Sequence, residues 1–212
     1  IKTKEINQIN YLNKIDLVKF LSKENYLKKY IYISTPEVFG SNKKFIKENS
    51  NNFNPSSPYA TSKLSFEFFL KNYYKSFKFP AILSRFSNFY GPNQATNRLI
   101  PQLLLKILKK EKFILQGSGN FIRSYIYKDD FVSGIEKMIN SGVPGSTYHF
   151  SGDDFYTTKE VIKLTCSLFN YKFKDLVTEG KNRISQDYCY KLDTRNTKKK
   201  LRWKCRTNLK KG

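Results

Sequence analysis

The chain has 212 residues, of which 39 are Lys or Arg and 17 are Asp or Glu, so its formal net charge is +22. Hydrophobic residues make up 39% of the chain and aromatic residues 16%, which is too much apolar material for a disordered segment and predicts a packed core. No stretch reaches the roughly 18 consecutive apolar residues of a membrane span, and the first residues lack the apolar run of a signal peptide. Its 3 cysteines favour reduced thiols over a disulfide framework. We expect a folded cytoplasmic protein that does not enter a membrane.

The high net charge has two interpretations. A basic surface can bind nucleic acid, and the segment from Lys198 to Arg206 has 6 basic residues in 9 and contains Trp203, which could stack on a base. However, most of the basic residues are Lys, and Lys, Asn, Phe and Tyr all have A/T-rich codons, so a coding bias explains the same composition. Because phosphate and base recognition prefers the Arg fork, we favour the second interpretation and expect no nucleic-acid partner.

Apolar spacing and turn residues predict an alternating series of helices and strands. Thr157 and Glu160 have the spacing of a capping box, which indicates a helix after them. The order strand, helix, strand over residues 30–86 is typical of a parallel sheet in an α/β fold. The expected helices span 5–23, 59–76, 98–110 and a segment from Asp129 or Asp130 to Asn140, and the expected strands span 30–33, 81–86, 112–116, 121–127 and 147–150.

One glycine-containing segment, Gly117-Ser118-Gly119-Asn120, lies between two of these expected strands. It lacks the third glycine of a phosphate-binding loop. We therefore expect it to be a hairpin turn.

Tyr59 and Lys63 lie four residues apart in an expected helix, so both side chains share one face. Deprotonating a free phenol at pH 7 costs about 4 kcal/mol, and a neighbouring ammonium lowers that cost. The pair is a candidate general base for an alcohol, although a Lys-rich helix contains such pairs by chance.

The neighbourhood of this pair strengthens the hypothesis. Strand 30–33 runs directly into Ser34, Thr35 and Glu37, and strand 81–86 runs into Ser87 and Asn88. Ligands of open parallel sheets bind at the carboxyl ends of the strands. We therefore expect these side chains to meet at one site.

In this order the motifs resemble the extended short-chain dehydrogenase/reductases that act on nucleotide sugars, especially the dTDP-glucose 4,6-dehydratase type. Segments 34–40, 59–63 and 85–92 are similar to its Thr-Asp-Glu, Tyr-x-x-x-Lys and Arg-x-x-Asn-x-Tyr-Gly-Pro motifs. The resemblance implies the C-terminal half of a Rossmann-like NAD-binding domain over 1–92, to which segments around 121–150 partly return. It implies a smaller α/β nucleotide-sugar-binding domain over 93–212.

The resemblance also implies roles for individual residues. Tyr59 would take the proton of the sugar O4 while hydride passes to NAD, Lys63 would hold the nicotinamide ribose and lower the Tyr59 pKa, and Thr35 would bind the same hydroxyl. Glu37 would remove the C5 proton as water leaves. Ser34 and Ser87 are expected to contact the cofactor, no metal is expected, and the expected substrate contacts are Asn88, Leu99, Arg123 and Arg183.

The chain also departs from the family pattern. Pro36 replaces the family's Asp, which leaves a nucleotide-sugar 4-epimerase or a UDP-glucuronate decarboxylase as alternatives, and Ser124 and Cys205 replace a family Asp and Pro. The Gly-rich βαβ opening of the family is absent, so we expect the chain to be a fragment that lacks activity as it stands. Family members dimerise through two helices that resemble 5–23 and 59–76, which predicts a homodimer.

Overall fold

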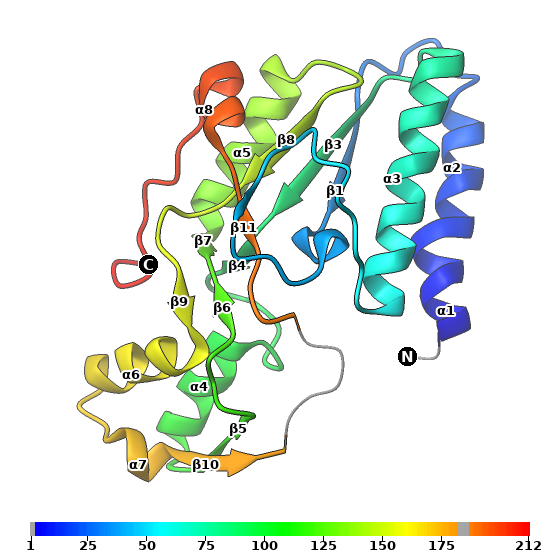
Figure 1. The fold of residues 1–212 in the computed structure, drawn as a ribbon. Coiled ribbons are helices and arrows are strands. Elements are labelled where there is room, and N and C mark those ends of the chain that lie inside the picture. Colours follow the sequence, from blue (N-terminus) through cyan, green and yellow to red (C-terminus); the bar gives the residue numbers. More distant parts are fainter. Residues whose placement is uncertain (1–2, 182–186) are drawn as a thin grey trace.

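The computed structural model describes residues 3–181 and 187–212, which form an α/β fold (Figure 1). Its central sheet is parallel and has the order β1-β3-β8. Ser34 lies opposite Arg85 in the first ladder, and Arg85 lies opposite His149 in the second. The three strands are β1 (Tyr30–Ser34), β3 (Ala81–Phe86) and β8 (Thr147–Phe150). The predicted βαβ unit and the parallel sheet are confirmed.

Helices pack on both faces of this sheet. The two faces of β3 alternate, so Ala81 and Leu83 join one apolar cluster while Ile82 and Phe86 join another. The first face is covered by a π-helical turn (Gln8–Leu12), α2 (Asn13–Leu21) and α3 (Pro58–Phe77), and α1 (Thr3–Asn7) packs on α3. The second face is covered by α5 (Lys128–Ser141) and α8 (Arg195–Leu201). This two-sided cover explains why all six residues of β3 are buried.

Helix α3 carries the predicted Tyr and Lys pair, and its ends are well defined. The Ser57 hydroxyl accepts a hydrogen bond from the backbone N–H of Ala60 at 3.1 Å, and Pro58 occupies the first turn. The helix ends where Lys78 adopts a left-handed conformation with φ of 57°. None of the helices within residues 3–181 and 187–212 is long and apolar enough to cross a membrane.

The remaining elements gather around a third apolar cluster below the sheet in Figure 1. The capping box at Thr157 is confirmed, because its hydroxyl and the Glu160 carboxylate each accept a backbone N–H of the other residue. This group contains β4 (Asn88–Tyr90), α4 (Leu99–Leu108), β5 (Phe113–Gln116), β6 (Ile122–Arg123), β7 (Tyr125–Tyr127), β9 (Tyr156–Thr157), α6 (Thr158–Leu168), α7 (Phe173–Leu176) and β10 (Val177–Gly180). The division of the chain at residues 92 and 93 stays a prediction.

The expected hairpin around Gly117 is wrong. Strand β5 pairs in parallel with β10, and β6 pairs antiparallel with β9, so the turn from Gly117 to Asn120 connects two different ladders. The segment between β1 and α3 contains a 3-10 turn (Pro36–Phe39) and strand β2 (Phe45–Ile46), which pairs with β11 (Lys191–Leu192).

Candidate active site

A cavity of about 510 Å³ lies at the carboxyl ends of β1 and β3. The first turns of α3, the segment after β3 and the start of α4 complete its wall. Of the ten residues expected at the site, eight line this cavity: Ser34, Thr35, Glu37, Tyr59, Lys63, Ser87, Asn88 and Leu99. The structure therefore brings together the candidate base, the candidate carboxylate and the segments that the resemblance assigns to cofactor and substrate.

Thr35 and Glu37 are held by the turn that follows β1. The Thr35 hydroxyl accepts a hydrogen bond from the backbone N–H of Glu37 at 3.3 Å and so caps the 3-10 turn. The chain then bends at Gly40, whose φ of +61° and a backbone oxygen 2.2 Å from a Cβ built there leave no room for a side chain. Pro36 is buried in this turn, and a proline side chain has no proton to give to a leaving group.

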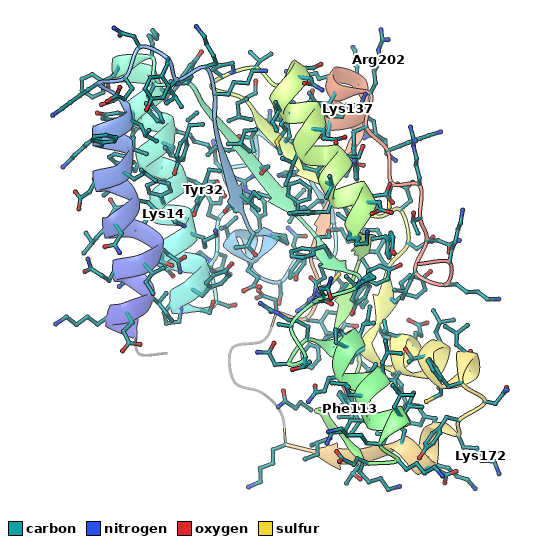
Figure 2. All side chains as sticks on the ribbon, turned by 180° about the vertical axis from the view of Figure 1, so that it is seen from behind. Lys14, Tyr32, Phe113, Lys137, Lys172 and Arg202 are labelled. Carbon is teal, nitrogen blue, oxygen red and sulfur yellow. The ribbon has the colours of Figure 1, made fainter. Side chains whose placement is uncertain are left out.

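Lys63 is buried and points at β1. Its Nζ donates a hydrogen bond to the Ile33 carbonyl at 2.6 Å and lies 4.6 Å from the centre of the Tyr32 ring. Lys14 reaches the same ring from α2, with its Nζ 5.1 Å from the ring centre (Figure 2). Burial, and to a smaller extent the charge of Lys14, lower the pKa of Lys63 to about 8. The carboxylate of Glu67 acts in the opposite direction and raises this pKa.

Tyr59 is 39% exposed at the rim of the cavity. Partial burial and the Glu37 carboxylate raise its pKa, while the Arg98 guanidinium acts in the opposite direction. The expected lowering of this pKa by Lys63 is not found. The physical reason is that the Lys63 ammonium is directed at the Ile33 carbonyl.

The sequence reasoning missed several residues of this wall, among them Gln94, Arg98 and Tyr190. Tyr190 is buried, and its hydroxyl donates a hydrogen bond to Asn88 Oδ1 at 3.0 Å. Burial raises the pKa of its phenol. Arg98 directly precedes Leu99, an expected substrate contact, and this neighbouring position is the sequence signal that could have predicted its place in the wall.

Arg123 is not part of the cavity wall. Its guanidinium donates hydrogen bonds to the backbone carbonyls of Ile122, Asp187 and Tyr188 and lies 4.3 Å from the centre of the Tyr190 ring. Arg123 thus supports the tyrosine that contacts Asn88. Its expected contact with substrate stays a prediction, and Arg183 lies outside the described residues.

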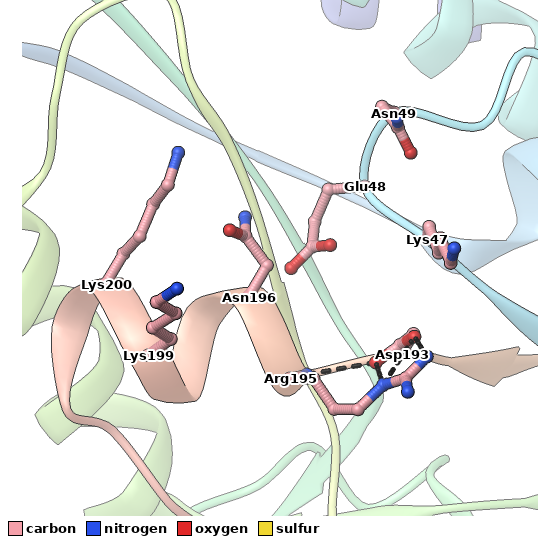
Figure 3. Close-up of a pocket in the computed structure, with 8 residues that line it drawn as sticks. All are labelled: Lys47, Glu48, Asn49, Asp193, Arg195, Asn196, Lys199 and Lys200. Carbon is pink, nitrogen blue, oxygen red and sulfur yellow. Dashed lines mark hydrogen bonds and ion pairs between the residues drawn. The ribbon is translucent and has the colours of Figure 1, made fainter.

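A second cavity, of about 630 Å³, lies between the segment after β2 and helix α8 (Figure 3). Its wall is charged, and Asp193 binds Arg195 through two oxygens, with the shortest N to O distance 2.7 Å. It contains none of the expected catalytic residues. Its lining residues are Lys47, Glu48, Asn49, Asp193, Arg195, Asn196, Lys199 and Lys200.

The basic segment from Lys198 to Arg206 does not present its tryptophan to a ligand. Trp203 is only 2% exposed, its indole N–H donates to the Asp130 carbonyl at 3.0 Å, and its ring packs edge-on against Phe150. The base stacking in the nucleic-acid hypothesis is therefore contradicted. Within the described part of the chain, no group of three or more His, Cys, Asp or Glu side chains could hold a metal ion.

Known proteins are similar to this chain in fold and in sequence. A protein from Dictyostelium discoideum named dTDP-D-glucose 4,6-dehydratase is 38% identical over 152 residues, which cover 66% of this chain and 35% of that protein. The crystal structure of dTDP-glucose 4,6-dehydratase from Bacillus anthracis in complex with NAD superposes with a TM-score of 0.90 at 28% identity, covering 97% of this chain and 65% of that one. A UDP-glucose 4-epimerase from Thermotoga maritima reaches a TM-score of 0.91 at 24% identity, covering 100% and 69%, and supports the fold alone.

The chain spans about a third of the length of the Dictyostelium relative and about two thirds of the Bacillus structure. The model of the family described as GDP-mannose 4,6 dehydratase matches residues 1–212, which is the entire chain. The match agrees with the parallel sheet and with the Tyr and Lys pair beside the ends of β1 and β3. This chain belongs to the GDP-mannose 4,6 dehydratase family, among whose members it is similar to dTDP-glucose 4,6-dehydratases.

Proposed function

We propose that the protein to which this chain belongs is an NAD-dependent nucleotide-sugar 4,6-dehydratase. One observation carries the proposal: Thr35, Glu37, Tyr59 and Lys63 line one cavity at the carboxyl ends of two parallel strands. The similarity to the Bacillus anthracis dehydratase, whose structure was determined with NAD, supports the same chemistry.

The residues of the cavity fit a dinucleotide cofactor. Ser34 is only 6% exposed, and its Oγ has no hydrogen-bond partner within the described residues. Lys63 lies beside it in the cavity wall, so a hydroxyl and a cation are available to a ribose. When bound, NAD would accept a hydride from the sugar and return it later.

The protein side chains would move the protons. Tyr59 would accept the proton of a sugar hydroxyl, which Thr35 would orient through its own hydroxyl. Burial and Glu37 raise the Tyr59 pKa, and the Arg98 guanidinium would partly offset this rise. Glu37 would then remove the proton next to the new carbonyl group.

Pro36 supports an alternative within the same fold. A dehydratase must protonate the departing hydroxyl, and the residue between Thr35 and Glu37 has no proton to give. Glu37 or water would supply it in a dehydratase. A 4-epimerase or a UDP-glucuronate decarboxylase would need no such donor at this position.

The test uses the complete protein with dTDP-glucose and NAD. We expect a 4-keto-6-deoxy sugar, detected by mass spectrometry, and its loss in Tyr59→Phe and Glu37→Gln. Tyr26→Phe and Glu179→Gln change exposed residues outside the cavity and serve as matched controls that keep activity. Formation of a 4-epimer, or release of CO₂ from a UDP-uronate, would instead identify one of the alternatives.

We also propose that the protein forms a homodimer through α1, α2 and α3. Helices α2 and α3 carry exposed apolar side chains, including Leu17, Phe20 and Phe77. Light scattering after size exclusion would give twice the monomer mass, and a monomer at micromolar concentration would contradict the proposal. The cytoplasmic location expected from the sequence stays a prediction.

A further inference from the structure

Gln94 lies in the wall of the candidate active site, between β4 and α4, and its side-chain amide has a fixed orientation. The Nε2 atom donates a hydrogen bond to the Phe89 carbonyl at 2.6 Å. A carbonyl oxygen can only accept, so the nitrogen of the amide must face Phe89. The amide oxygen is thereby the atom left for another partner.

This oxygen has no partner within the described residues. Gln94 Oε1 is one of two buried side-chain polar atoms without a hydrogen bond in residues 3–181 and 187–212, and the other is Ser34 Oγ. Both residues belong to the wall of the same cavity. An unsatisfied buried acceptor costs about 1–3 kcal/mol, which a donor entering this cavity would remove.

The chemistry of the atom limits what can satisfy it. An amide oxygen needs a donor, so ionised phosphate and carboxylate groups are excluded. A nucleotide sugar offers donors on its sugar ring, and the residues that would act on this ring, Tyr59 and Glu37, line the same cavity.

We propose that Gln94 is a specificity-determining residue whose amide oxygen accepts a hydrogen bond from a hydroxyl group of the substrate's sugar. The proposal rests on the proposed nucleotide-sugar function and adds a contact that discriminates among sugars. A site that holds a buried acceptor for a hydroxyl rejects a sugar lacking that hydroxyl, because the acceptor is then left unpaired.

The experiment measures dissociation constants of the complete protein for dTDP-glucose and for dTDP by titration calorimetry. Gln94→Met keeps the length of the side chain and removes the acceptor, and Gln102→Met makes the same change in α4 outside the cavity. We expect Gln94→Met to weaken dTDP-glucose binding about tenfold and to leave dTDP binding unchanged. Gln102→Met should change neither constant.

Analogues of dTDP-glucose that each lack one hydroxyl separate a direct contact from a disturbed loop. One analogue should bind the wild-type protein about tenfold more weakly than dTDP-glucose but bind Gln94→Met as well as dTDP-glucose does. Unchanged dTDP-glucose affinity in Gln94→Met, or an equal loss for dTDP, would overturn the role of Gln94. Failure of the wild-type protein to bind either nucleotide would overturn the proposed function itself, and this inference with it.

Discussion

Replacing Glu67 with Gln should destabilise the chain strongly. Glu67 on α3 and Arg85 on β3 are both fully buried, Arg85 Nε donates to Glu67 Oε1 at 2.9 Å, and a second ion-pair contact joins Nη2 to Oε2. On its other side, Arg85 Nη1 lies 2.9 Å from His149 Nε2, and His149 Nδ1 lies 3.1 Å from the Ile46 carbonyl. That carbonyl requires a donor, so Nε2 is an acceptor and His149 is neutral.

The magnitude follows from this arrangement. Glu67→Gln keeps the volume of the side chain, so no cavity forms, but the Arg85 charge loses its partner. Burial and the charge of Arg85 lower the pKa of His149; the neutral imidazole accepts a hydrogen bond from Arg85 but brings no negative charge to replace that of Glu67. Leaving one member of a buried ion pair unpaired costs about 3–5 kcal/mol, a large part of the 5–15 kcal/mol that stabilises a typical domain.

Urea denaturation followed by circular dichroism measures the effect. We expect the free energy of unfolding to fall by about 3–5 kcal/mol in Glu67→Gln and by less than about 0.5 kcal/mol in Glu179→Gln, which changes an exposed carboxylate on β10. A loss below about 1 kcal/mol in Glu67→Gln would refute the argument, because it would mean that Arg85 is solvated or paired elsewhere.

Three further substitutions test other parts of the structure. Lys63 has a pKa of about 8 in the fold and about 10.4 when unfolded. Between these two pKa values the unfolded chain binds more protons than the folded chain. The free energy of unfolding of the wild type, relative to that of Lys63→Met, should therefore rise by up to about 3 kcal/mol from pH 8 to pH 10.5. A difference that stays constant over this range in urea unfolding would contradict the shift. Trp203→Phe loses the hydrogen bond to the Asp130 carbonyl and should lower the free energy of unfolding by about 2 kcal/mol in urea denaturation. An unchanged urea midpoint would contradict this expectation. Gly145→Ala places a Cβ 2.2 Å from the Tyr74 ring at φ of +82°, so its melting temperature should fall by several degrees while Ser141→Ala stays near wild type.

The parts of the fold that the sequence predicted well have a local sequence pattern of their own. The strand at 30–34 and the helix at 58–77 carry their own periodicity or caps, and both formed within one residue of the expected bounds. The two-residue strands β2 and β11 lack such a pattern, because their hydrogen bonds come from partners far away in the chain. The wrong prediction of a hairpin at Gly117 has the same cause. The glycines correctly indicated a turn, but the sequence does not show that β5 pairs with β10 and β6 with β9.

The candidate site shows the same limit. Ser34, Thr35, Glu37, Tyr59 and Lys63 were found because they adjoin the ends of predicted elements. Tyr190 comes to the cavity from the distant C-terminal part of the chain, 102 residues beyond Asn88, and is placed by tertiary packing alone. The orientation of the Lys63 side chain could not be predicted either. A four-residue spacing places Lys63 on the same helix face as Tyr59, but it does not show that the Lys63 ammonium binds the Ile33 carbonyl.

The net charge of +22 does not extend into the candidate active site. Among the described residues of the cavity wall, the side chains charged at neutral pH are the acidic Glu37 and the basic Lys63 and Arg98, so the wall carries little of this net charge. Burial shifts Lys63, Tyr59 and Tyr190 toward their neutral forms. Such a wall suits a neutral polar ring held by hydrogen bonds, as a sugar would be. The surface lysines can then raise the rate at which an anionic nucleotide arrives, a contribution that salt screens, without deciding which sugar is accepted.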